Sequence, residues 1–162
     1  MSAVSLSGGG SGAADDAGPA ASRAAAAFRG SAAFSWGAGR WDLFEVTAVA
    51  TLRHRAWVDG ALAVDEDLGG TLASAPTAVA WAVDQAEVFA VFPDGALWNR
   101  YWDGTSWHPW ESLGGELDPE SAPACSSWGA DRLDVFAGGL DGATWHRWWD
   151  GSRWVEWERL PA

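Results

Sequence analysis

The chain repeats itself at intervals of 45 and 47 residues, and this period constrains its fold more than any other feature of the sequence. The second and third copies, 80–113 and 127–160, are identical at 17 of 34 positions aligned without a gap. All three copies keep a tryptophan and a phenylalanine at matching places, namely Trp36, Trp81 and Trp128, and Phe44, Phe89 and Phe136. Self-similarity at a nearly fixed period indicates one supersecondary unit used three times in succession.

Asp-Gly pairs punctuate the second and third copies at Asp94-Gly95, Asp103-Gly104, Asp141-Gly142 and Asp150-Gly151. Between aromatic or β-branched runs, Asp-Gly is a preferred two-residue hairpin turn in which both central residues take a positive φ. Each copy is therefore predicted to form four short antiparallel strands, which in the third copy are 124–128, 132–138, 143–149 and 153–159. The segments show no helical periodicity, which argues against a solenoid of alternating strands and helices.

A four-stranded meander at this period is typical of a propeller blade. The sequence thus predicts an all-β protein with three four-stranded antiparallel β-propeller blades per chain, at about 31–75, 76–121 and 122–162. Residues 1–30 are rich in Gly, Ala and Ser and are predicted to form a flexible leader. They lack a basic segment followed by an apolar one, so a secretory signal is not expected and the compartment stays open.

The formal net charge of −12 argues against nucleic acid as a partner, because phosphate contacts need a basic face. The same charge disfavours an anionic membrane surface, and no apolar run is long enough for membrane insertion. Cys125 is the one cysteine of the sequence, so neither an intrachain disulfide nor a thiolate metal cluster is possible. A neutral ligand fits this charge balance best.

Motifs for catalysis, metal binding and cofactor binding are missing from the sequence. The three histidines are scattered without metal-ligand spacing, and neither a phosphate loop nor a nucleotide fingerprint occurs. Acidic residues recur at Asp42, Glu87 and Asp134, each two residues before the repeated phenylalanine. Repetition alone explains that pattern without any chemistry. We therefore expect no enzyme activity, no metal and no cofactor.

The third copy, "SWG…RLDVF…DGATWHRWWDGSRWVEWERL", resembles the repeat of the PLL-like lectins, β-propellers named after a Photorhabdus lectin. The resemblance covers residues 32–162. It is weaker in the first copy, where Val49-Ala50 replace an Asp-Gly pair, Arg53 replaces a tryptophan, and Leu62 and Asp65 replace the pair Trp107 and Trp110. The resemblance implies a seven-bladed propeller that binds carbohydrate, prominently of the fucose type, without catalysis.

Three blades do not close a ring, since propellers of roughly four to eight blades bury both faces of each blade on its neighbours. A sheet with one uncovered aromatic face would aggregate. We expect oligomerisation to complete the ring, first of all as a homodimer with six blades, because two-fold assemblies are the commonest. Blades from another polypeptide, or a longer parent chain, are the alternatives. The seven blades of the family are not divisible by three, which counts against a simple homo-oligomer.

A sugar pocket is expected between adjacent blades, where an aromatic ring stacks on the apolar face of a hexose and Arg, Asn or His binds its hydroxyls. The predicted partner is a fucosylated or similar glycan. We predict that the sugar-binding residues are among Trp98, Asn99, Arg100, Trp102, Trp107, Trp110, Trp145, His146, Arg147, Trp149, Trp154 and Trp157. In the third copy the ring that faces the ligand is expected to be Trp149 or Trp154, beside Arg147 and His146.

Each of these residues also has a purely structural interpretation. The aromatic rings can fill the layers between blades, and Arg100 or Arg147 can pair with an acid of a neighbouring blade. Trp107 and Trp110, like Trp154 and Trp157, are three residues apart, so in a regular strand one of each pair packs while the other faces a ligand. The alternative function is a structural or protein-interaction propeller fragment that binds no sugar.

Overall fold

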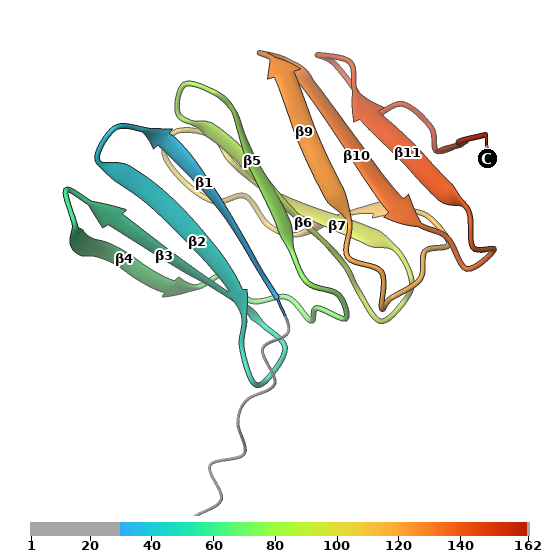
Figure 1. Cartoon of the computed structure of the whole chain (residues 1–162), viewed down its shortest axis with the longest axis horizontal. Helices are drawn as coiled ribbons and strands as arrows, with labels where there is room; N and C mark the ends of the chain where they lie inside the picture. The colour runs from blue at the N-terminus through green and yellow to red at the C-terminus, as the bar shows by residue number, and fades with distance from the viewer. Residues whose placement is uncertain (1–29, 162) are drawn as a thin grey trace, which may run out of the picture.

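The computed structural model describes residues 30–161, which form three four-stranded antiparallel sheets, each of them one blade (Figure 1). Blade 1 comprises β1 (Ser31–Gly37), β2 (Arg40–Val46), β3 (Leu52–Val58) and β4 (Ala61–Asp67). Blade 2 comprises β5 (Thr77–Ala82), β6 (Gln85–Val91), β7 (Leu97–Trp102) and β8 (Glu111–Gly114). Blade 3 comprises β9 (Ala124–Gly129), β10 (Arg132–Gly138), β11 (Thr144–Trp149) and β12 (Glu158–Arg159). The prediction of an all-β chain with three four-stranded blades is confirmed.

The blades stand side by side with their first strands adjacent. Within each blade the strands pair in chain order, and β1 lies beside β5 as β5 lies beside β9 (Figure 1). The fourth strands are on the opposite edge, as in a propeller whose first strands surround the axis. Residues 1–29 of the predicted leader lie outside the described residues. Within 30–161, no helix is long and apolar enough to cross a membrane.

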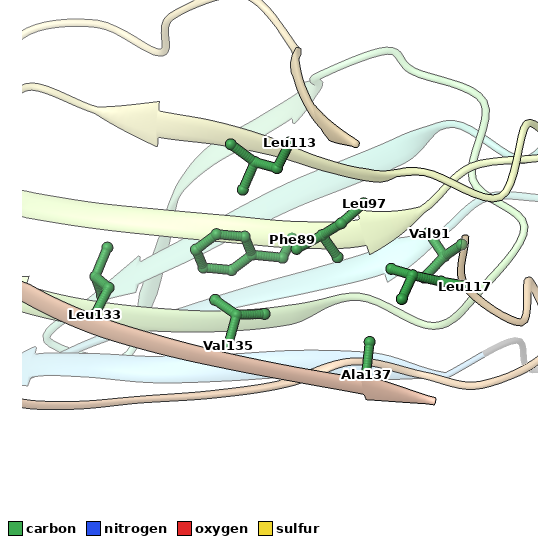
Figure 2. Close-up of a cluster of buried hydrophobic side chains, with 8 residues drawn as sticks. All are labelled: Phe89, Val91, Leu97, Leu113, Leu117, Leu133, Val135 and Ala137. Carbon is green, nitrogen blue, oxygen red and sulfur yellow. The ribbon is translucent and has the colours of Figure 1, made fainter. Parts of the chain in front are cut away.

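Two apolar layers hold the blades together, and β6 of the middle blade contributes to both. Its alternate side chains diverge, so that Val88 and Ala90 face blade 1 while Phe89 and Val91 face blade 3. The buried layer between blades 1 and 2 contains Phe44, Leu52, Leu68, Leu72, Val88 and Ala90. The layer between blades 2 and 3 contains Phe89, Val91, Leu97, Leu113, Leu117, Leu133, Val135 and Ala137 (Figure 2).

Each junction also has a polar tie, in which two side chains of one blade donate to a single backbone carbonyl of the blade before it. In blade 2, Arg100 Nη1 and Trp110 Nε1 donate to the carbonyl oxygen of Leu68, the tryptophan over 3.0 Å. In blade 3, Arg147 Nη1 and Trp157 Nε1 donate in the same way to Leu113. The repeat therefore encodes the contact between blades as well as the blade itself.

The outer faces of blades 1 and 3 carry the same repeat positions with no blade against them. Trp128 on blade 3 is 81% exposed, whereas the matching Trp36 and Trp81 are partly buried beside the following blade. On blade 1, Trp41 and Trp57 stack on each other with ring centroids 3.9 Å apart. Blades 1 and 3 therefore each have one uncovered face whose residues match those that form the junctions within the chain.

The fourth strand of blade 3 is shorter than the sequence predicted. β12 contains only Glu158–Arg159 instead of 153–159, and Trp154 ahead of it makes an isolated bridge to Trp149. The chain leaves regular strand geometry between these points, and Trp157 thereby reaches the carbonyl of the preceding blade. Both Trp154 and Trp157 consequently pack against blade 2, as Trp107 and Trp110 pack against blade 1. The expectation that each pair divides between opposite faces is wrong.

The Asp-Gly turns differ from the predicted geometry in one respect. At Asp94-Gly95 only the glycine has a positive φ, of 77°, and the aspartate does not. The Asp94 carboxylate instead accepts a hydrogen bond of 3.0 Å from the backbone N–H of Ala96. Asp141-Gly142 repeats this arrangement. The aspartate therefore acts as an Asx-turn residue, and only the glycine position needs left-handed geometry.

Blade 1 makes the equivalent turn with Ala50 at the glycine position, where its φ is 65°. A left-handed alanine costs about 1 kcal/mol because its Cβ approaches the following carbonyl oxygen. We expect Ala50→Gly to raise the free energy of unfolding by about 0.5 to 1 kcal/mol, measured by urea denaturation. Ala63→Gly in β4, where φ is negative, should lower it. A loss of stability in Ala50→Gly would contradict the strain at this turn.

Candidate functional site

A cavity of about 340 Å³ lies between blades 2 and 3. Blade 2 lines it from all four of its strands, and blade 3 lines it from the β9–β10 turn, β10, β11 and the segment that follows β11. The lining residues are Trp81, Gln85, Glu87, Asn99, Tyr101, Glu111, Asp131, Leu133, Trp149 and Trp154. A volume of this size, with aromatic walls and a few polar groups, is typical of a site for a small ligand.

Glu87 of β6 and Asn99 of β7 form the polar floor of this cavity. Their strand positions point toward blade 3, and only 4% and 3% of the two residues is exposed. Asn99 Nδ2 donates to Glu87 Oε1 over 2.5 Å. The other amide atom, Asn99 Oδ1, is buried and has no hydrogen-bond partner in the described part of the chain. A buried acceptor without a donor costs free energy, so this atom favours a ligand that brings a donor.

Trp149 and Trp154 form the aromatic wall on the side of blade 3. Their ring centroids are 6.0 Å apart and their planes meet at 62°. The backbone bridge between the two residues sets this arrangement, and Trp154 is further fixed by an edge contact with Phe89 at 5.8 Å. Two rings at a steep angle give a concave apolar corner above the polar floor.

Four polar positions recur in every blade, and in blade 1 they form a closed network of Arg40, Asp42, His54 and Glu66. Asp42 accepts hydrogen bonds from Arg40 Nε and Nη2 over 3.1 and 3.2 Å, and its carboxylate lies 2.9 Å from His54 Nε2. His54 Nδ1 lies 2.9 Å from Glu66. Blade 3 repeats the whole network with Arg132, Asp134, His146 and Glu158 on its uncovered face.

Blade 2 lacks both cationic members of this network, and the cavity lies where they are missing. Gln85 stands at the place of Arg40 and Asn99 at the place of His54, while Glu87 and Glu111 keep the two acids. Between blades 1 and 2 the His54 ring meets the edge of Trp107 with centroids 5.6 Å apart, so the corresponding space is filled. The two junctions also differ at Tyr101 and Leu133, which stand where the first junction has Ala56 and Ala86.

The carboxyl groups of the two junctions have opposite pKa shifts. Burial raises the pKa of Asp42, but hydrogen bonds from His54 and Arg40 outweigh it and hold that pKa below its ordinary value. Burial also raises the pKa of Glu87, which has no cation beside it, to about 8, against a weaker lowering by the Asn99 hydrogen bond. Glu87 is therefore largely protonated at neutral pH, when its carboxyl group is a hydrogen-bond donor as well as an acceptor.

The predicted site residues fall into three places. Five of them face blade 1 from blade 2, namely Trp98, Arg100, Trp102, Trp107 and Trp110. Six meet at the junction of blades 2 and 3, namely Asn99, Trp145, Arg147, Trp149, Trp154 and Trp157, and three of these, Asn99, Trp149 and Trp154, line the cavity. His146 lies on the uncovered face of blade 3, paired with Asp134 and Glu158.

Two details of the sequence interpretation need correction. His146 does not lie beside Trp149 and Trp154, because it is on the opposite face of β11. Arg100 and Arg147 pair with a backbone carbonyl of the preceding blade rather than with an acid. Their guanidinium groups reach across a junction, and burial lowers the pKa of both.

Sequence reasoning missed most of the polar lining of the cavity, including Gln85, Glu87, Tyr101 and Glu111. In the sequence, Glu87 stands out only as a repeated acidic position. The sequence does contain a signal for this lining, because the second copy has Gln85 and Asn99 where the first and third copies share an arginine and a histidine.

Glu87 should make the stability of the chain depend on pH. Its pKa is about 8 when folded against 4.5 as an ordinary glutamate, so stability should fall as pH rises through that interval. Glu87→Gln should remove this fall and raise the free energy of unfolding at about pH 8 by roughly a few kcal/mol, because a tenfold change in a protonation equilibrium corresponds to about 1.4 kcal/mol. Urea titrations at about pH 5 and about pH 8 measure the effect. The exposed Glu116→Gln is the control, and an unchanged pH dependence in Glu87→Gln would contradict the assignment.

No family model and no curated protein matches the chain. Solved structures do match it. The BP39L lectin of Burkholderia pseudomallei is 25% identical with a TM-score of 0.71, over 83% of this chain and 42% of that one. A lectin of Aleuria aurantia, described as a six-bladed β-propeller with a novel mode of fucose recognition, is 17% identical with a TM-score of 0.67, over 82% and 45% of the two chains.

A third solved structure is matched over nearly the whole of its chain. The fucose lectin of Kordia zhangzhouensis, solved in complex with methyl-fucoside, is 21% identical with a TM-score of 0.58. The match covers 78% of this chain and 96% of that one. The chain therefore spans less than half of the first two lectins and nearly the whole of the third. These likenesses agree with the blade architecture and confirm the β-propeller fold.

Proposed function

We propose that the protein is a non-enzymatic lectin that binds a neutral sugar of the fucose type between blades 2 and 3. The observation that carries this proposal is the cavity at that junction, which combines an aromatic corner with a buried polar floor. The similar solved structures support it, since they are described as lectins and several of them as fucose-binding. Membership of the PLL-like lectins in particular stays a prediction.

The geometry suits a hexose placed against the corner of Trp149 and Trp154. Either ring would stack on the apolar C–H face of the sugar, and the polar floor would bind hydroxyl groups. Asn99 Oδ1 would accept from one hydroxyl, which satisfies the buried oxygen, and the carboxyl of Glu87 would donate to another. Arg147 is not among the residues that line this cavity, and its Nη1 donates to Leu113.

A structural role is supported at the junction of blades 1 and 2. There the polar residues Arg40, Asp42, His54 and Glu66 bond to one another, and Trp107 packs over the histidine. Little is left in that arrangement for a ligand. The alternative proposed from the sequence, in which the tryptophans only pack, therefore describes this junction better than it describes the next one.

We further propose that a second copy of the chain completes the ring, with blade 1 of each copy docked on blade 3 of the other. Arg55 supports this proposal because it stands at the place of Arg100 and Arg147, on the uncovered face of blade 1. Leu160 stands at the place of Leu68 and Leu113, and its N–H donates to Thr144 as that of Leu68 donates to Leu52. Docking would let Arg55, whose Nη2 pairs with Glu45, donate to the carbonyl oxygen of Leu160 in the other copy and repeat the arginine contact of the existing ties.

The lectin proposal predicts that the chain binds fucosylated glycans on an array and that free fucose competes. Trp149→Ala should weaken binding of methyl-fucoside roughly tenfold, because it removes one stacking ring from the cavity. Isothermal titration calorimetry measures the change. Leu140→Ala is a matched control because that side chain is 71% exposed and outside the cavity. Absence of binding to every fucosylated glycan would overturn the lectin proposal.

The assembly proposal predicts a particle with the mass of two chains in multi-angle light scattering. Arg55→Ala should shift the particle toward single chains, since it removes the donor that would cross the new junction. Arg153→Ala is the control and should leave the mass unchanged, because the side chain of this arginine is 78% exposed and has no part in the proposed contact. A stable single chain in the parent protein would refute the six-bladed dimer.

A further inference from the structure

The cavity between blades 2 and 3 has kept the acids of the repeated network and lost its cations. Glu87, Glu111 and Asp131 line it, whereas none of the ten described lining residues is an arginine, lysine or histidine. At the corresponding places blade 1 has Arg40 and His54. The acids of blade 2 therefore lack the counter-charge that neutralises them in blades 1 and 3.

The floor of the cavity is built for a donor that the chain does not supply. Asn99 is 3% exposed, lines the cavity, and leaves Oδ1 without a hydrogen-bond partner among residues 30–161. Its neighbour Glu87 receives a hydrogen bond from the same side chain and is 4% exposed. A cationic N–H group placed here would satisfy both oxygen atoms at once.

The walls of the cavity also suit a cation. Trp149 and Trp154 meet at 62°, and Trp81 and Tyr101 complete the lining around the floor. The face of an indole ring attracts a cation by its quadrupole, and more strongly when water is excluded. Trp154 stands at the place of Trp107, which at the neighbouring junction contacts the imidazole of His54.

We propose that this cavity binds an organic ammonium group, which takes the place of the cationic side chains that Arg40 and His54 provide at the neighbouring junction. The ammonium would lie against Trp149 and Trp154, with its charge directed toward Glu87 and Asn99. The net charge of −12 would favour the approach of such a ligand. An amino sugar would satisfy both this inference and the proposed lectin function, but the inference does not depend on sugar binding.

Ethanolamine, whose ammonium group carries N–H donors, and its neutral isostere 1-propanol test the charge preference without any sugar, in full-chain titrations followed by tryptophan fluorescence. Ethanolamine should bind roughly tenfold or more tightly than the isostere. Glucosamine and glucose provide the same comparison on a sugar scaffold. Ethanolamine affinity should increase from about pH 6 to about pH 8 as Glu87 ionises. The other titratable groups around the cavity are Glu111, Tyr101, Asp131 and Cys125.

Substitutions that restore the network of the other blades provide the decisive control. Gln85→Arg should pair with Glu87 as Arg40 pairs with Asp42, and should abolish the preference for ethanolamine. Gln85→Met has a side chain of similar length without charge and should retain it. Glu87→Gln should remove both the preference and its pH dependence. Thermal unfolding of each variant establishes that it is folded.

The outcomes separate this inference from the lectin proposal. Equal affinity for ethanolamine and its isostere, or a preference that survives Gln85→Arg, would overturn the ammonium site and leave the lectin proposal standing. An ethanolamine preference that disappears in Gln85→Arg but not in Gln85→Met supports the site, even if no neutral sugar binds.

Discussion

The relative placement of the blades depends on one backbone carbonyl in each blade that accepts hydrogen bonds from the next blade. Leu68 and Leu113 each receive an arginine and a tryptophan from the following blade, at a junction that also contains an apolar layer. A buried guanidinium without a carboxylate partner is costly by itself, so these contacts favour one relative placement of two sheets. The apolar layers supply most of the burial, whereas the arginine and the tryptophan fix the register between blades.

The three copies show how a repeat can serve packing and binding with the same framework. Arg40, Asp42, His54 and Glu66 satisfy one another, and a network of this kind has little capacity left for a ligand. Blade 2 keeps the four-stranded framework, yet its Gln85 and Asn99 are smaller than Arg40 and His54 and are uncharged. The result is a cavity, an orphaned amide oxygen and a carboxyl group with a raised pKa at the same place.

Blade number, strand content and the alternation of β7 and β11 could be predicted from the sequence because they follow from period and from side-chain spacing. The partner of Arg147 could not, since a backbone carbonyl leaves no trace in the sequence. The packing of Trp154 and Trp157 against the same blade could not be predicted either, because it depends on the chain leaving strand geometry after Trp154. The polar floor could be found only by comparing copies, because Glu87 looks like its counterparts until the loss of its cationic partners is noticed.

The uncovered faces of blades 1 and 3 are not identical. They correspond to the two opposite sides of a junction. Blade 3 presents the side that would receive an arginine, with a complete polar network at His146, and blade 1 presents the side that supplies the arginine. Blade 1 has Leu62 and Asp65 where the other blades have tryptophans, and Asp65 is occupied by Arg53 over 2.6 Å. A junction formed by these two faces would therefore lack the aromatic corner seen between blades 2 and 3. Closure of the ring by two copies would add two such junctions, each with a complete polar network, rather than further copies of the cavity.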